Sequence, residues 1–203
     1  MSTLSTYNSS LATDPLRSFR FTATFTQPQG ADAPFSTKIL TGGAGGWVGG
    51  FTTVSGLSIN NQNITYREGG YNTTVHQVPG MTSFSPVTFQ RGVLVGNNQA
   101  INWMRGLFAA ASGDGLATTS AAKTFRVNVD IYVMDHPNAG PTNKNTPKMK
   151  FRIHNAWISG LNYTDLNAND GALFYESMQL VHEGLTVGFT NDSGEFVGRA
   201  ITD

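Results

Sequence analysis

A long polar hairpin is the feature that most constrains what this chain can fold into. Residues 57–67 are predicted to form a strand, residues 68–70 a glycine turn, and residues 71–78 a returning strand that Pro79-Gly80 closes. At about 3.3 Å per residue the first strand spans roughly 30 Å, which is long for a globular domain. Its middle is polar on both faces, and its apolar positions change parity between Ile59 and Ile64, which predicts a bulge or a strong twist. Such a hairpin exposes strand edges that need closure by neighbours, as in a barrel, unless it lies on its own sandwich.

The rest of the chain is predicted to be mainly strands. Apolar and polar residues alternate over residues 19–26, 87–93 and 125–133, with the period of half-buried strands. Further strands are predicted over residues 47–54, 149–159 and 171–183, with at most one more short strand after Gly184. Ala100, Met104 and Leu107 fall at helical spacing and predict one packed helix over residues 97–112. About seven or eight strands and one helix indicate a mainly β fold, an antiparallel sandwich or barrel.

Charge is scarce in this sequence. Charged residues make up 13% of the chain, with a formal net charge of zero. A subunit whose surface is covered by neighbours needs little charge for solubility, although a simply neutral Thr/Asn/Ser-rich surface is the alternative. The balance argues against a polybasic nucleic-acid binder, so no stable nucleic-acid site is expected. Residues 1–13 lack the basic and apolar regions of a signal peptide, and no apolar stretch is long enough to predict a membrane segment.

No constellation in the sequence predicts catalysis. His182-Glu183 and Asp135-His136 are the pairs that invite a catalytic or metal-site interpretation, but neither has the rest of a known motif around it. The chain has no cysteine, which excludes thiolate zinc sites and thiol nucleophiles. We therefore expect a protein that is not an enzyme, with no catalytic, cofactor-binding or metal-binding residues.

A series of short motifs carries a resemblance to a known family. Their order along the chain resembles that of the tail tube proteins of contractile phages and related contractile injection systems, and the match covers residues 14–185. The motifs are Asp14-Pro15-Leu16-Arg17, Val54-Ser55-Gly56-Leu57, Tyr66-Arg67-Glu68-Gly69-Gly70, Val78-Pro79-Gly80, Arg91-Gly92, His154-Asn155-Ala156-Trp157, Asp165-Leu166-Asn167-Ala168 and Val181-His182-Glu183-Gly184-Leu185.

The resemblance implies a structural subunit whose hexameric rings stack into a hollow tube that conducts DNA into the host cell. The long hairpin is then expected to contribute to an inner β-barrel that runs around the ring. The expected partners are further copies of the chain, a sheath protein, baseplate and tail-terminator proteins, and a tape measure protein and DNA in the lumen. The expected location is the virion, with the host cytoplasm before assembly. An injection system that delivers a protein toxin, or a baseplate-proximal ring that initiates the tube, is the alternative.

One domain is expected over residues 1–203, with an N-terminal arm at residues 1–17. Residues 27–46 and 135–147 are expected as enlarged loops, and residues 185–203 as a C-terminal extension. The resemblance also implies which residues lie at contacts between subunits or between rings. These are Ser55, Gly56, Tyr66, Arg67, Glu68, Gly69, Gly70, Asn72, Pro79, Gly80, Arg91, His182 and Glu183.

The lumen is expected to be neutral. The strand after Val-Ser-Gly-Leu is usually acidic in the family, whereas residues 58–62 carry no charge here. Small polar side chains would let a polyanion pass without sticking. The residues expected to line the channel are Ser58, Asn60, Gln62, Thr88 and Gln90.

Overall fold

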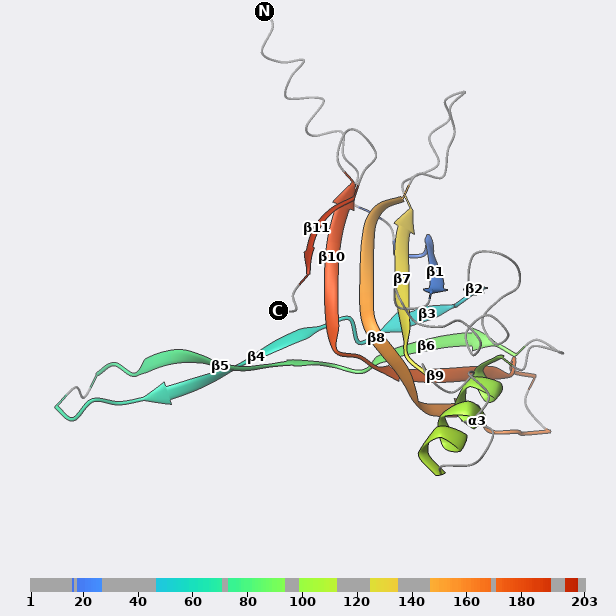
Figure 1. Ribbon diagram of the computed structural model, residues 1–203, viewed down its shortest axis with the longest axis horizontal. Coiled ribbons are helices and arrows are strands. Elements are labelled where there is room, and N and C mark those ends of the chain that lie inside the picture. Colours follow the sequence, from blue (N-terminus) through green and yellow to red (C-terminus); the bar gives the residue numbers. More distant parts are fainter. Residues whose placement is uncertain are drawn as a thin grey trace, which may run out of the picture.

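The strand β8 (Pro147–Tyr163) ties the molecule together, because its two halves pair with different neighbours (Figure 1). Its first half lies between β7 (Val127–Met134) and β10 (Gly184–Thr190), and its second half pairs with β9 (Tyr175–Val181). The computed structural model describes residues 16, 18–26, 47–70, 73–93, 99–112, 125–134, 147–168, 171–190 and 196–200. Within these residues, β8 divides one antiparallel sheet into two half-sheets.

The two half-sheets differ in their other strands. The first half-sheet contains β2 (Trp47–Gly49), β1 (Phe21–Thr26), β7, the first half of β8, β10 and β11 (Phe196–Ala200). The second half-sheet contains β3 (Thr53–Ser55), β6 (Val87–Gly92), β9 and the second half of β8. Their strands run in different directions in Figure 1, so the bend of β8 folds one half-sheet over the other.

A corner at Asn155 produces this bend. Its φ of 51° is the only positive φ at a non-glycine position in the described part of the chain. Asparagine tolerates this left-handed conformation because its short side chain bonds locally. The Asn155 backbone N–H donates to Asn128 Oδ1 at 3.0 Å, and its Nδ2 donates to Glu183 Oε2 at 2.7 Å. Three segments that are distant in sequence thus stabilise the corner.

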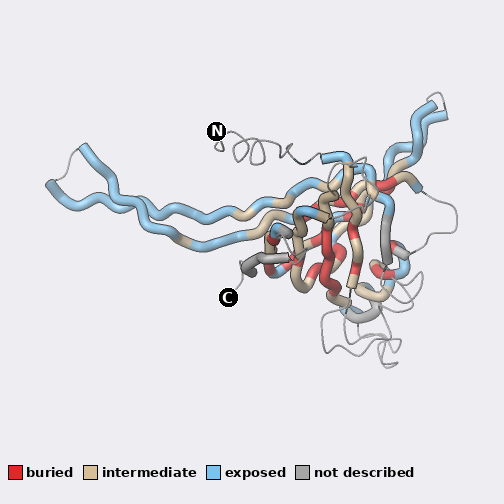
Figure 2. The backbone as a smooth tube through the Cα atoms, turned by 90° about the horizontal axis from the view of Figure 1, so that it is seen from above, coloured by how far each residue is buried: buried red, intermediate tan, exposed pale blue. Residues whose placement is uncertain are grey.

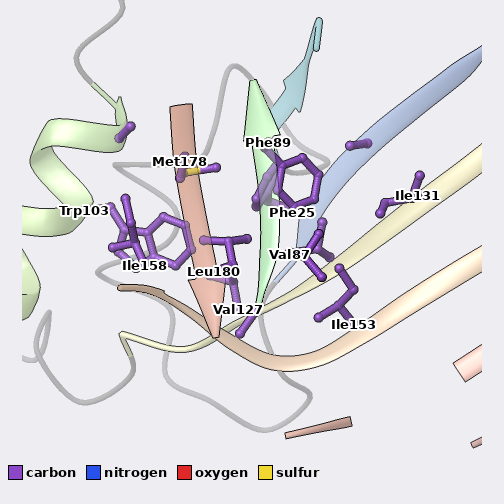
Figure 3. Packing of buried hydrophobic residues seen from close by; sticks show 14 of the residues in the cluster. Phe25, Val87, Phe89, Trp103, Val127, Ile131, Ile153, Ile158, Met178 and Leu180 are labelled. Carbon is purple, nitrogen blue, oxygen red and sulfur yellow. The ribbon is translucent and has the colours of Figure 1, made fainter. Parts of the chain in front are cut away.

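The core lies between the half-sheets and is rich in aromatic residues (Figure 3). The inward residues of β1 and β6 include Phe25 and Phe89, whose ring centroids lie 5.7 Å apart across the sandwich. Phe51 packs on both, at 5.9 Å and 5.1 Å. The alternation along the sequence therefore separates a buried face from an outer face, as predicted for these strands.

One helix, α3 (Gln99–Ser112), appears in the described residues and closes one end of the sandwich. Trp103 is fully buried, and its ring meets that of Phe25 edge-on at 6.4 Å. Its indole Nε1–H donates to the Phe125 carbonyl at 2.8 Å, so the buried polar atom is satisfied. The predicted mainly β fold with one packed helix is confirmed.

The long hairpin projects away from this body (Figures 1 and 2). It consists of β4 (Ile59–Tyr66) and β5 (His76–Phe84), which pair only with each other in the described structure. We call β4, β5 and the described residues 67–70 and 73–75 between them the arm. Nearly every arm residue is exposed, so the predicted hairpin exists and does not lie on its own sandwich.

Several predicted strand boundaries are wrong. Residues 47–54 form two strands rather than one, because β2 pairs with β1 while β3 pairs with β6 in the other half-sheet. The chain after Gly184 forms two strands, β10 and β11, instead of at most one. Pro79-Gly80 does not close the hairpin but lies inside β5, where Pro79 faces Asn63. The described residues hold eleven strands, more than the seven or eight predicted.

Candidate assembly surfaces

A β-bulge divides the arm into two parts. Asn61 pairs with Thr82 and Asn63 pairs with Pro79, so one residue of β4 faces two residues of β5. The pairing is thus irregular where a bulge or strong twist was predicted, but the extra residue lies in β5 and not in the predicted strand β4. A Cβ on Gly80 would lie 2.8 Å from the Gln62 carbonyl oxygen, so glycine is needed for the close approach of the strands.

One face of the arm is a ladder of amides and hydroxyls. Asn61 Nδ2 donates to Thr82 Oγ1 at 3.1 Å, and Asn63 Nδ2 donates to Gln77 Oε1 at 3.3 Å. These cross-strand side-chain bonds stabilise a hairpin that buries little apolar area.

The opposite face of the arm is apolar beyond the bulge. Tyr66 stacks on His76 with ring centroids 5.1 Å apart, and Ile64 faces Val78 across the strands. Ile64 remains 53% exposed and Val78 45% exposed. We call Ile64, Tyr66, His76 and Val78 the arm strip.

The base of the arm is joined to the body by tight backbone contacts. Gly56 has a φ of 89°, and a Cβ there would lie 2.2 Å from the Pro86 carbonyl oxygen. Ser85 N–H donates to the Ser58 carbonyl at 3.4 Å, which keeps the incoming and outgoing chains together. Only glycine fits this position, because both its φ and the space around it exclude a side chain.

His182 packs against the same base. Its Nε2 lies 3.1 Å from the Ser85 carbonyl oxygen, and its Nδ1 lies 3.1 Å from that of Gly184. Its ring also contacts Phe84 at 5.5 Å. Burial lowers the pKa of His182, and the two carbonyl oxygens partly oppose this shift. His182 therefore connects the arm to the β9–β10 junction within one chain.

The outer face of the second half-sheet is polar and uncharged at its centre. Thr88 and Gln90 point away from the core, since their neighbours Val87, Phe89 and Arg91 point into it. Pairing places other small polar residues beside them. We call this set the polar face: Thr53, Ser55, Thr88, Gln90, Asn162, Ser177 and Gln179.

The predicted lining residues fall into two groups. Thr88 and Gln90 lie on the polar face, whereas Ser58, Asn60 and Gln62 are exposed at the base and first half of the arm. Ser177, Gln179 and Asn162 were missed by the sequence analysis. The sequence shows that Ser177 and Gln179 lie at alternate positions of one strand. Only the strand pairing shows that these residues and Asn162 extend the row begun by Thr88 and Gln90.

Arg91 is buried and forms an ion pair inside the chain. Its Nη2 lies 3.2 Å from Glu176 Oε1 and 3.3 Å from Oε2, and the residues are 6% and 4% exposed. The guanidinium, which the resemblance implied at a contact between subunits, is thus engaged with a neighbouring strand of the same chain.

Glu183 also has partners within the chain. Its carboxylate accepts from Asn155 and pairs with Arg126. Nearby, His154 Nε2 lies 2.6 Å from Thr186 Oγ1, and burial followed by the Arg152 charge lowers the pKa of His154. These contacts hold the corner of β8.

The remaining predicted contact residues follow the arm. Tyr66, Arg67, Glu68, Gly69 and Gly70 lie together at its tip, where Gly70 has a φ of 102° that makes the turn possible. Pro79 and Gly80 lie in its middle, and Ser55 and Gly56 at its base. Asn72 lies outside the described residues, as do residues 1–15, 17, 27–46 and 135–146.

An apolar groove opens between the half-sheets on the side of β3. Phe19, Phe21 and Phe51 line it together with Val54 and Leu57. Phe19, one of the residues that line the groove, is 69% exposed.

The described residues contain no group of three or more His, Cys, Asp or Glu side chains that is able to hold a metal ion. No helix among them has the length and apolarity needed to span a bilayer.

Solved structures share this fold. The anti-feeding prophage baseplate, solved as a 6-fold symmetrised structure, contains a chain with a TM-score of 0.62 and 17% identity, covering 86% of this chain and 95% of that one. A chain of the anti-feeding prophage tube-terminating cap has a TM-score of 0.60 and 18% identity, covering 87% and 92%. A chain of the sheath-tube complex of an extracellular contractile injection system has a TM-score of 0.59 and 15% identity, covering 99% of each chain.

Sequence comparison identifies the family. A search of curated proteins finds no match. The family profile of the T4-like virus tail tube protein gp19 matches residues 17–186, which include both half-sheets up to the start of β10, the helix and the arm. The resemblance found in the short motifs is thereby confirmed: this chain belongs to the family of T4-like virus tail tube proteins.

Proposed function

We propose that this protein is the repeating structural subunit of a phage tail tube. Hexameric rings stack into a hollow tube that conducts DNA into the host cell, and the protein catalyses no reaction. We infer six subunits per ring by analogy with the 6-fold symmetrised anti-feeding prophage baseplate, which contains a chain with the same fold. One observation carries the proposal: the arm extends from the body with both faces exposed (Figure 2).

An isolated two-stranded hairpin is only marginally stable in water, since it buries too little apolar surface to offset the conformational entropy of its residues. The arm also carries two unpaired strand edges, which in a monomer invite aggregation. Assembly removes both difficulties, because neighbouring subunits cover the apolar strip and complete the hydrogen bonding of the edges. The expected contact residues at the tip, Tyr66 to Gly70, lie where an arm would meet the next ring.

The polar face is the proposed wall of the channel. Its hydroxyl and amide side chains carry no charge, so they neither repel the phosphate backbone nor bind it through released counterions. Asn60, Gln62 and Ser58 continue this wall onto the base of the arm. A tape measure protein and then DNA occupy the lumen transiently.

The outside of the tube faces other components of the tail. The solved relatives in fold come from a sheath-tube complex, a baseplate and a terminating cap. We therefore include a sheath protein, baseplate proteins and a tail terminator among the partners, and we assign the protein to the virion, with the host cytoplasm before assembly.

Negative-stain microscopy of the purified full chain tests the proposal. We expect rings or tubes with a central hole, and six-fold class averages of end-on views. Uniformly monomeric particles at high protein concentration would overturn it. Rings that never stack would instead indicate a tube-initiating ring.

The cargo needs a separate test, because one solved structure with this fold belongs to an extracellular contractile injection system. Native particles purified from producing cells should contain DNA that is protected from nuclease. Particles that lack a capsid and DNA but contain a protein in the tube would indicate a toxin-delivery device.

A further inference from the structure

Ten of the fifteen exposed large apolar side chains in the described residues lie at two opposite ends of the molecule. At one end they lie on the arm, with Ile64, Tyr66, Val75, Val78 and Met81 exposed. At the other end a second group surrounds the connection between β8 and β9, which projects from the body away from the arm (Figure 2). We call this group the rim: Val93, Tyr163, Leu166, Leu173 and Phe174. Contiguous exposed apolar surface of this kind marks an interaction site.

The rim is an ordered surface. Tyr163 stacks on Phe174 with ring centroids 5.7 Å apart and an interplanar angle of 11°. Val93 N–H donates to the Phe174 carbonyl at 3.0 Å, and Thr164 N–H donates to the Tyr175 carbonyl at 3.0 Å. The end of β6 and the β8–β9 connection therefore present one aromatic platform that needs little rearrangement on binding.

The arm strip and the rim resemble each other chemically. Each consists of aliphatic side chains around a stacked pair of flat rings, Tyr66 with His76 and Tyr163 with Phe174. The arm continues the direction of β6 and β9, and the rim lies where these strands end on the other side (Figure 1). Two different patches at opposite ends make a head-to-tail contact that repeats from copy to copy.

We propose that the arm strip of one subunit docks on the rim of a second copy in the adjoining ring. This inference rests on the proposed stacking and adds the surface that receives the arm. Since β6 and β9 carry the polar face as well as the rim, each arm then meets the next subunit at the end of its channel wall.

The apolar groove beside β3 is the competing acceptor. It is lined in part by Val54 and Leu57, which lead directly into the base of the same chain's arm. Thr52 and Thr53 also line it, beside Gln90 further along β6. The groove therefore runs along the side of the half-sheet at β3, whereas the rim lies at the end of β6. A neighbour that is stacked in the same orientation presents its rim to the arm and its groove sideways.

Engineered cysteines distinguish these acceptors, because the natural chain has none. Met81→Cys places a thiol on the arm, Leu173→Cys one on the rim, and Phe19→Cys one at the groove. The three native side chains are similarly exposed, at 79%, 73% and 69%, so the variants are matched. Full-length single-cysteine proteins are mixed pairwise, assembled, oxidised mildly and analysed on a non-reducing gel, with microscopy of the same samples.

The proposal predicts a disulfide-linked dimer of Met81→Cys with Leu173→Cys that is roughly tenfold or more abundant than the dimer with Phe19→Cys, because docking raises the local thiol concentration. The rim would be rejected as the acceptor if Met81→Cys cross-linked equally well to Phe19→Cys. It would also be rejected if most dimers joined two Met81→Cys chains. Tubes seen by microscopy without the rim cross-link would reject this inference and leave the proposed function intact. Absence of both cross-links and rings would count against the proposed function itself.

Discussion

The arm and the body use the same antiparallel pairing but obtain their order differently. In the body, strands such as β1 and β6 bury one face, and residues such as Phe25, Phe89 and Leu180 are completely inaccessible. In the arm, both faces stay exposed, and pairs such as Asn61–Thr82 take the place of a core. The body is therefore stabilised by its own core, whereas we expect the arm to be stabilised by contacts with other chains. Substitutions in the body should therefore alter stability, whereas substitutions in the arm should alter assembly.

The largest expected loss of stability comes from the core. Phe89→Ala removes a ring that contacts Phe25 and Phe51, and should lower the free energy of unfolding by about 3–5 kcal/mol. Ile64→Ala in the arm should change it by less than about 0.5 kcal/mol, because an exposed side chain leaves no cavity. Urea denaturation of monomeric protein measures both. Similar losses for the two variants would remove the distinction between body and arm.

The next largest loss of stability should come from the buried ion pair between Arg91 and Glu176. Arg91→Met leaves the Glu176 carboxylate buried without its partner and should cost about 3 kcal/mol. The double variant Arg91→Met with Glu176→Leu should recover most of that loss, since no buried charge then remains. A double-mutant cycle by urea denaturation checks this, and additive losses would contradict the pairing.

The joint between arm and body depends on Gly56. Gly56→Ala puts a Cβ 2.2 Å from the Pro86 carbonyl oxygen at a positive φ, and should destabilise the protein by about 1–3 kcal/mol. Gly69→Ala at the tip is the matched control, because its Cβ would meet no atom within 4 Å. Thermal denaturation should separate the two, and an unaffected Gly56→Ala would show that the base of the arm is not fixed as described.

The stability of the protein should also depend on pH, with a smaller effect than those of the substitutions above. Burial lowers the pKa of His182 in the folded state, so the unfolded state binds the proton more readily. Stability is then complete above the unfolded histidine pKa of about 6.5 and falls as the pH drops below it. His182→Gln should reduce this slope in thermal denaturation between neutral and mildly acidic pH. The slope that remains is assigned in part to His154, whose pKa is lowered as well.

The smallest effect on stability should come from the arm strip. Ile64→Ser with Val78→Ser should leave monomer unfolding unchanged within about 0.5 kcal/mol. The same variant should fail to form stacked tubes, as measured by sedimentation and microscopy. Asn61→Ser with Thr82→Ser, on the amide face, is the control that should still assemble. Normal tubes from the arm-strip variant would show that the exposed apolar residues are not an assembly surface.

Much of the fold was predictable where each strand has one buried face. The alternation at Phe21, Ala23 and Phe25 predicted β1, and the same pattern predicted β6 and β7. The parity change before Ile64 predicted an irregularity at this point of the hairpin, although the extra residue lies in the partner strand β5. The short strands β2 and β3 were not separable in sequence, because only their different partners divide them. Likewise, β10 contains two glycines and forms because β8 and β11 flank it.

The candidate surfaces were predictable in part. Arg91 shares the parity of Val87 and Phe89 and is buried with them, but its partner Glu176 is 85 residues away in sequence. Local patterns contain no information on such pairing. The same limit applies to the polar face, whose residues come from four strands that only the folded chain brings into register.

The shared strand β8 has a mechanical consequence. A pull on the second half-sheet, where the arm and the rim are attached, reaches the first half-sheet along covalent backbone rather than across a side-chain interface. The ladders on either side of β8 then bear the load in shear, with many hydrogen bonds resisting at once. A tube of such subunits would transmit axial force through its walls while each subunit keeps its shape.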